Sequence, residues 1–183
     1  YNIIIIIMAD SNTDQNMHPL YDKWTFWAHL PHDTDWSIGS YQKLVTISTI
    51  EEVITLNNII PDEMICNCMI FIMREGINPL WEDKNNVNGG SFSFKINNDV
   101  VSDLWREIVY LLVGEYIIKN DKNNIKINGI TISPKKNFCI IKIWFKDCSV
   151  QNVKCLNINE KFNINGCLFK KHANIHRLGT KSI

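Results

Sequence analysis

The sequence of 183 residues lacks any apolar run near the roughly 20 residues that a membrane-spanning helix requires. Its opening, YNIIIIIMAD, has neither the basic start nor the small-residue cleavage site of a secretory signal. These absences predict a soluble, cytoplasmic protein without a membrane partner. Met8 begins a polar segment, so we expect it to be the native start, with residues 1–7 as additional sequence.

The cysteines lack the CxxC and Cys/His spacings of zinc sites. All six are irregularly placed, which favours a reduced chain without disulfides, and no metal or cofactor is expected. Cys66 and Cys68 are two residues apart within Ile65–Met73, which is rich in β-branched residues and therefore predicts a strand. In a strand both thiols would share one face.

Signals of catalysis are also missing. The sequence shows no phosphate loop, no metal-ligand pattern and no recognisable pairing of a nucleophile with a base. The adjacent carboxylates Glu51 and Glu52 are better explained as the start of a helix than as an acid pair. We therefore expect a protein that is not an enzyme.

The chain lacks a net charge, with 19 basic and 19 acidic residues, which argues against a general nucleic-acid coat. The charges are nevertheless segregated. Residues 1–118 contain 6 Lys and Arg against 16 Asp and Glu, whereas residues 119–183 contain 13 against 3. Any one charge run can be an ordinary solvated face, but the imbalance also fits a phosphate-facing surface in the C-terminal part.

The pattern of the chain predicts an α+β fold. We expect a flexible N-terminal tail over residues 1–17 and a single domain over residues 18–183. Helices are predicted from Thr49, where Thr49–Glu52 forms a capping box, and from Asp99 to Val113. Alternating β-branched and aromatic residues predict strands at Lys43–Ser48, Ile65–Met73, Ser91–Ile96, Gly129–Ser133 and Phe138–Phe145.

Tryptophan is the abundant residue here, with six copies. Trp24, Trp27 and Trp105 lie in apolar or helical segments and are predicted to be core residues. Trp36 and Trp81 differ, because HDTDWSIGS and NPLWEDKNN are polar, turn-rich segments. A large aromatic side chain in a loop needs to be covered, either by the domain itself or by a ligand.

Two parallel indoles can hold a nucleobase between them, with stacking worth roughly 1–3 kcal/mol per face. A base methylated at N7 is positively charged and gains a further cation–π attraction of about 0.5–2 kcal/mol. Glu82, next to Trp81, can accept two hydrogen bonds from the N1–H and N2 amino groups of guanine. On the residues alone, a plain surface turn at Trp81-Glu82 remains the competing interpretation.

Several motifs in order resemble the eukaryotic initiation factor 4E family across roughly residues 18–175. They are His18-Pro19-Leu20 with Trp24-Thr25-Phe26-Trp27, Trp36, Gly76-Ile77-Asn78-Pro79-Leu80-Trp81-Glu82-Asp83, Asn88-Gly89-Gly90, Ser102-Asp103-Leu104-Trp105 and Ile143-Trp144. The resemblance implies a curved antiparallel sheet of about eight strands, backed by about three helices on its convex face. It also implies a monomer that binds the 7-methylguanosine 5′ cap of mRNA.

By matching position, the resemblance makes Trp36 and Trp81 the stacking pair and Glu82 the residue that reads the guanine edge. It places Trp144 beside the N7-methyl group, although core packing is an alternative for that residue. The family's arginine for the cap phosphates falls on Ser133 or Pro134 here, in a segment about two residues longer. Lysines are then expected to contact the phosphates, namely Lys135, Lys136 and Lys142.

The resemblance also implies a surface for a helical peptide from a scaffold protein of the initiation factor 4G type. This partner surface comprises His18, Pro19, Leu20, Ile50, Ile54, Arg106, Glu107 and Tyr110. Ile54 stands where the family has a tryptophan, and Arg106 and Tyr110 stand where it has leucines. A charged side chain on an apolar groove can exclude the usual ligand, so a divergent partner is expected.

Three functions remain open from the sequence. The first is a cap-binding factor that recruits mRNA for translation initiation. The second is a cap-binding repressor with a non-standard partner. The third is an interaction module that has lost cap binding and keeps its tryptophans for structure only.

Overall fold

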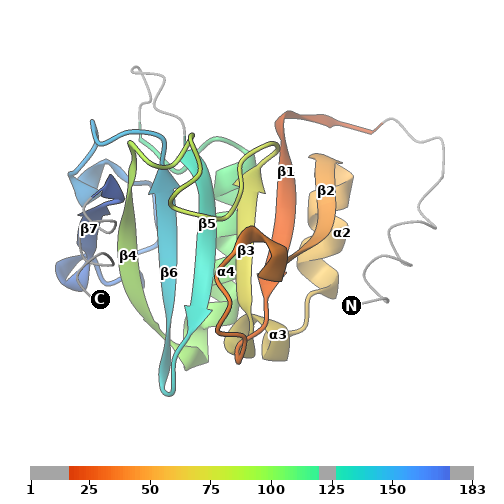
Figure 1. Cartoon of the computed structure of the whole chain (residues 1–183), viewed down its shortest axis with the longest axis horizontal. Coiled ribbons are helices and arrows are strands. Elements are labelled where there is room, and N and C mark those ends of the chain that lie inside the picture. Colours follow the sequence, from red (N-terminus) through yellow and green to blue (C-terminus); the bar gives the residue numbers. More distant parts are fainter. Residues whose placement is uncertain (1–16, 120–126, 174–183) are drawn as a thin grey trace.

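The computed structural model describes residues 17–119 and 127–173, and this part of the chain contains one sheet with helices packed behind it (Figure 1). The sheet has seven strands in the order β2-β1-β3-β5-β6-β4-β7, and every pairing is antiparallel. The strands are β1 (Pro19–His29), β2 (Tyr41–Thr49), β3 (Met69–Arg74), β4 (Gly90–Asn97), β5 (Ile127–Pro134), β6 (Phe138–Phe145) and β7 (Leu168–Lys171).

Three α-helices cover one face of the sheet. They are α2 (Ile50–Ile59), α3 (Asp62–Asn67) and α4 (Asn98–Val113), and short 3-10 turns η1, η2 and η3 occupy Ile38–Ser40, Val153–Cys155 and Ile164–Gly166. The predicted capping box is confirmed: the Thr49 hydroxyl accepts from the Glu52 amide, and the Glu52 carboxylate accepts from the Thr49 amide. α4 buries an apolar stripe that includes Leu104, Trp105 and Ile108 against the sheet.

Alternation along the strands gives the sheet two different faces. In β6, Ile141 and Ile143 point into the main core with the helices, whereas Trp144 joins a second cluster with Tyr41, Phe71 and Met73. The same alternation places Lys142 on the face away from the helices, because it is two residues from Trp144. The loops between β1 and β2 and between β3 and β4 lie on this open face (Figure 1).

The predicted fold class is confirmed, with seven strands instead of about eight among the described residues. The strand predicted at Ile65–Met73 is wrong in its first part. Asp62–Asn67 forms α3, Cys68 is its C-cap, and the strand begins at Met69. Pro61 followed by Asp62 and Glu63 is a helix-start signal that outweighs the two-residue cysteine period. The two thiols therefore belong to a helix and its cap, not to one strand face.

Two strands were not predicted, and part of the predicted domain organisation lies outside the described residues. β1 and β7 were not anticipated, since β1 is interrupted by polar side chains and β7 is only four residues long. Residues 1–16 of the predicted tail lie outside the described part of the chain. The single domain over residues 18–183 stays a prediction.

Candidate functional site

A cavity of about 460 Å³ opens on the face of the sheet away from the helices. It is lined by aromatic, apolar and polar side chains together: Trp36, Tyr41, Met69, Phe71, Pro79, Leu80, Trp81, Glu82, Thr131, Ser133, Lys135, Lys142 and Trp144. Six of the seven residues that the sequence suggested for the cap, all except Lys136, meet at this one cavity. A volume in this range suits a small organic ligand.

The floor of the cavity comes from three neighbouring strands. Thr131 of β5 pairs with Phe71 of β3 on one side and with Lys142 of β6 on the other, so these three side chains form one row across the sheet. Trp144 lies two residues along β6 in the next row and is only 7% exposed. A rigid sheet therefore fixes an aromatic ring and a cation side by side.

Trp36 enters the cavity from the loop between β1 and β2 and is 54% exposed. Side-chain hydrogen bonds hold the loop on both sides of it. The Asp33 carboxylate accepts from the Asp35 amide at 2.8 Å, and the Asp35 carboxylate accepts from the Ser37 amide and hydroxyl at 2.8 Å each. These bonds lower the pKa of Asp35, so its carboxylate stays charged.

Trp81 and Glu82 enter from the loop between β3 and β4. Gly76 allows the loop to start with a turn at φ +81°, a conformation that side chains rarely adopt. The buried Asn86 side chain then donates to the carbonyl oxygens of Asn78 and Leu80, at 3.0 and 2.7 Å. These internal bonds stabilise the backbone next to Trp81, which remains 39% exposed.

His172 connects the end of β7 to this loop. Its Nδ1 donates to the carbonyl oxygen of Asn86 at 2.7 Å, and its ring lies 4.9 Å from that of Trp144. Burial lowers the pKa of His172, and the positive charge of Lys142 adds to this effect, against opposing contributions from the Asn86 bond and Glu82. A neutral imidazole therefore packs beside Trp144.

Three lysines give the cavity a positive side. Burial lowers the pKa of Lys142, and the charges of Lys135 and Lys170 lower it further. Lys135 and Lys170 are therefore each within electrostatic range of Lys142, and an anion bound beside Lys142 would offset this repulsion. Lys170 lies on the β7 strand beside β4, in the segment Lys170–Asn174 that the resemblance places near the phosphates. Lys136 is exposed in the turn after β5 and does not line the cavity.

Tyr41 was not predicted as a site residue, since it opens β2 without any motif around it. Burial raises its pKa to about 12, and the negative charge of Glu82 contributes. The hydroxyl is therefore protonated at neutral pH and available as a hydrogen-bond donor at the cavity wall. With Glu82 as an acceptor and two lysines as donors, the cavity combines flat apolar surfaces with polar groups of both signs.

The residues predicted to form a partner surface lie on the helical face. Ile50, Ile54 and Tyr110 are 45%, 44% and 43% exposed. Leu20 packs against the main core, and Glu107 accepts a hydrogen bond from the Asn159 side chain at 3.0 Å. His18 is held by Glu51, which accepts from its ring and its amide at 2.7 and 3.0 Å.

Arg106 occupies the junction of this surface with the end of α2. Its guanidinium donates to the carbonyl oxygens of Asn57 and Ile60, at 3.2 and 3.0 Å, and pairs with Asp62 at 2.6 Å. The Asn57 side chain donates back to the Arg106 carbonyl at 3.1 Å. Arg106 thus provides hydrogen-bond donors for carbonyl groups at the C-terminal end of α2, and it fixes α2, α3 and α4 together.

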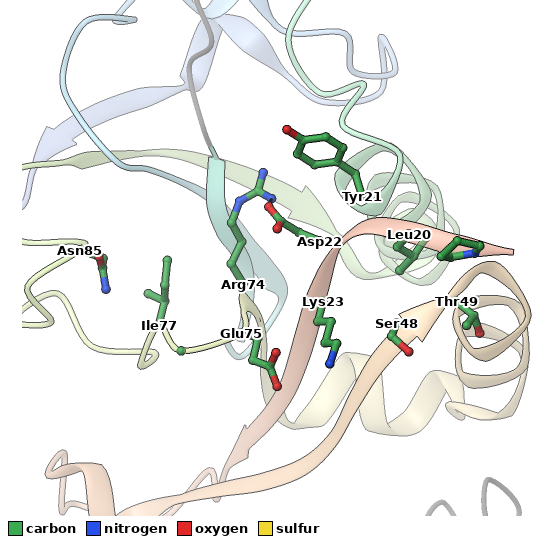
Figure 2. Close-up of a pocket in the computed structure, with 12 residues that line it drawn as sticks. Leu20, Tyr21, Asp22, Lys23, Ser48, Thr49, Arg74, Glu75, Ile77 and Asn85 are labelled. Carbon is green, nitrogen blue, oxygen red and sulfur yellow. Dashed lines mark hydrogen bonds and ion pairs between the residues drawn. The ribbon is translucent and has the colours of Figure 1, made fainter.

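A second cavity of about 780 Å³ lies between the start of β1 and the start of the β3–β4 loop (Figure 2). Arg74 borders it and is already engaged: it pairs with Asp22 and, at 2.6 Å, with Glu115, and it donates to the Ile127 carbonyl at 2.7 Å. The residues that line it include no tryptophan and bring together none of the predicted cap residues. We therefore assign the candidate site to the smaller cavity.

Two further findings bear on the sequence-based expectations. Over the described ranges, no cluster of three or more His, Cys, Asp and Glu side chains is arranged to hold a metal ion. Within the same ranges, no helix has the length and apolar character needed to cross a membrane.

The fold and the cavity together define a class of protein with an antiparallel sheet and helices on one face of it. The other face carries an aromatic cavity bordered by lysines, which suits a planar, negatively charged ligand. The chain belongs to the eukaryotic initiation factor 4E family, whose model matches residues 19–177. This is a family of translation initiation factors, which agrees with the expectation that the chain is not an enzyme.

Relatives in fungi support this placement, and solved structures from nematodes have a similar fold. Eukaryotic translation initiation factor 4E of Eremothecium gossypii is 32% identical over 85% of this chain and 74% of its own length. The Candida albicans factor is 31% identical, over 79% and 73%. In structure, the chain is similar to Caenorhabditis elegans eIF4E-3, solved with the 4E-binding protein Mextli and a cap analog, with a TM-score of 0.74.

That likeness covers 88% of this chain and 96% of the nematode chain at 21% sequence identity. Ascaris suum eIF4E-3 in complex with an m2,2,7G cap is also similar, with a TM-score of 0.64, 23% identity and coverage of 75% and 78%. At these identities the two structures bear on the fold alone. They match the sheet and helices described above.

Proposed function

We propose that this chain binds the 7-methylguanosine 5′ cap of mRNA and recruits capped mRNA for translation initiation. The single observation that carries the proposal is that Trp36, Trp81, Glu82 and Trp144, from three separate parts of the sequence, line one cavity together with lysines. Membership of the initiation factor 4E family supports it, as do the cap ligands named for the two similar nematode proteins.

In the proposed complex the methylated guanine lies between the rings of Trp36 and Trp81. The two indole faces favour the positive charge that N7 methylation creates, so the methyl group is recognised through charge. Glu82 accepts from N1–H and N2, an edge that adenine does not present. Trp144 contacts the N7-methyl side, and Tyr41 lines the same cavity.

The phosphates of the cap extend toward the lysines. Lys135 and Lys142 line the cavity, and Lys170 is close enough to influence Lys142. A phosphate between them would replace lysine–lysine repulsion with charge-assisted hydrogen bonds. Lys136, exposed in the same turn as Lys135, is proposed to contact phosphate more peripherally.

The partner surface supports a second part of the proposal, a scaffold protein of the initiation factor 4G type or a divergent equivalent. Its exposed Ile50, Ile54 and Tyr110 offer an apolar patch for a helical peptide. Arg106 is fixed within this surface by three acceptors, which favours a divergent partner. That observation keeps the cap-binding repressor as the alternative function.

The proposal is tested by binding of a short capped RNA and of the same RNA with a 5′ triphosphate. We expect the capped RNA to bind at least about tenfold more tightly, and Trp81→Ala and Glu82→Gln to remove this preference. Matched controls are Tyr116→Ala, another exposed aromatic, and Glu75→Gln, an exposed acid of the same loop. Equal binding of both RNAs would leave an interaction module without cap recognition.

A further inference from the structure

A buried histidine lies directly behind Trp36. The rings of His29 and Trp36 are stacked with centroids 4.4 Å apart and planes only 3° from parallel. His29 is 1% exposed, whereas Trp36 is 54% exposed. One face of the indole is thus covered by a fixed ring of the sheet, and the indole as a whole still borders the cavity.

Hydrogen bonding fixes the orientation of the His29 ring. Its Nε2 lies 2.8 Å from the carbonyl oxygen of Asp35, and because a carbonyl only accepts, Nε2 carries the proton and donates. This bond joins the last residue of β1 to the residue immediately before Trp36. Nδ1 has no hydrogen-bond partner among the described residues, so this one bond and the neighbouring rings determine the plane of the imidazole.

A second ring supports His29 from the β2 side. Tyr41 lies 4.9 Å from it at an angle of 59°, and Tyr41 in turn contacts Phe71 of β3 edge to face at 5.3 Å. The result is a continuous series of aromatic contacts from the sheet to the exposed tryptophan. Such packing restricts the rotamer of an indole that the loop alone would leave free.

We infer that His29 is a positioning residue for cap recognition: its ring presets the plane of Trp36 before the base arrives. This rests on the proposed function, in which Trp36 supplies one of the two stacking faces. Ordering a side chain in advance removes part of the entropic cost of binding. The imidazole itself touches no ligand, since Trp36 separates it from the base.

The variants His29→Phe and His29→Leu separate stacking from simple filling of the core. Phenylalanine keeps a flat ring and loses only the bond to Asp35, whereas leucine keeps apolar volume without a ring. We expect His29→Leu to weaken 7-methyl-GTP binding about tenfold, equivalent to about 1.4 kcal/mol, and His29→Phe to bind within about threefold of wild type. Thermal unfolding of both variants checks that the fold is intact.

A second readout does not depend on any ligand. The fluorescence anisotropy decay of Trp36 is obtained by subtracting the signal of a Trp36→Phe partner from that of each protein. We expect fast indole motion to increase in His29→Leu and to stay near the wild-type level in His29→Phe. If wild type fails to bind 7-methyl-GTP, the proposed function fails, and this measurement still decides whether His29 orders Trp36.

Two results would overturn the inference. In the first, His29→Leu binds 7-methyl-GTP as tightly as wild type and leaves the motion of Trp36 unchanged. In the second, His29→Phe is as impaired as His29→Leu, which would assign the effect to the Asp35 hydrogen bond and not to the stacked ring.

Discussion

At the scale of single residues, Lys142 is the clearest case of a side chain whose environment suits an anionic ligand. It lies in the middle of β6, on the floor of the cavity, with positive neighbours and no ion pair among the described residues. Burying an unpaired ammonium group is costly. A phosphate ligand would explain why a lysine is present at this position of the sheet.

The change Lys142→Gln should therefore weaken 7-methyl-GTP binding about tenfold, because one charge-assisted contact to phosphate is lost. Binding of 7-methylguanosine, which has no phosphate, should change less than about twofold. Isothermal titration calorimetry with both ligands measures the difference, and Lys154→Gln, an exposed lysine outside the cavity, is the control. An equal loss for both ligands would show that Lys142 does not act through phosphate.

His172 makes a pH-dependent contribution to stability. Burial lowers its pKa in the folded state below the ordinary value of 6.5. As the pH falls through about 6.5, the unfolded chain takes up a proton that the folded chain does not, so the free energy of unfolding decreases. The contribution is thus favourable above this range and is lost as the pH falls toward the folded-state pKa.

Denaturant unfolding of wild type and His172→Gln between pH 8 and pH 5.5 tests this. The variant should be less stable at pH 8 through the loss of its bond to Asn86, but its stability should fall less steeply with acid. His32→Gln, an exposed histidine, should keep the wild-type slope. A variant slope as steep as that of wild type would contradict the assignment.

At the scale of elements, the junction of α2, α3 and α4 distinguishes this chain from the pattern that its resemblance implies. Arg106 is not a free charge on a groove, since two carbonyl groups at the end of α2 and the Asp62 carboxylate engage it. Its removal therefore has two effects. It destabilises the junction, and an apolar replacement such as leucine adds apolar area to the surface that includes Tyr110 and Ile54.

We expect wild type to bind a standard Tyr-x4-Leu-apolar peptide more weakly than micromolar, and Arg106→Leu to bind it at least about tenfold more tightly. The same change should lower the unfolding free energy by about 1–3 kcal/mol, because the carbonyl groups lose their partner. Fluorescence polarisation of a labelled peptide measures the first effect, with Lys95→Leu as a control on the other side of the sheet. Micromolar or tighter binding by wild type would refute the divergent partner.

Sequence patterns predicted the elements well where local signals were strong. The capping box predicted at Thr49 is present at the start of α2, and the apolar residues at helical spacing in α4 are buried as predicted. The strand predicted at Ile65–Met73 was wrong in its first part, because the two-residue spacing of the cysteines is a weaker structural signal than the helix-start residues from Pro61. The paired residues Trp36 and Trp81 were found through motifs, but their supports were not. His172 contacts Asn86 and Trp144, which lie far from it in the sequence, and the stacking of His29 on Trp36 depends on the conformation of a loop; no local pattern reveals either.

At the scale of the whole molecule, the two faces of the sheet carry different features. Helices and the main core occupy one face, with the residues predicted to bind a partner, while the other face carries the cavity with its loops from β1–β2 and β3–β4. The charge segregation of the sequence has a structural counterpart, because Lys135, Lys142 and Lys170 all come from the basic C-terminal part. Glu82, from the acidic part, lies in the same cavity.

Tryptophan fluorescence titration of the wild-type protein with 7-methyl-GTP and with GTP tests the central claim most directly. Stacking of a charged base on Trp36 and Trp81 predicts strong quenching at micromolar or lower 7-methyl-GTP, and binding of GTP weaker by at least about tenfold, since only the methylated base gains the cation–π attraction. Equal affinity for the two nucleotides, or no quenching by either, would contradict cap recognition by this cavity.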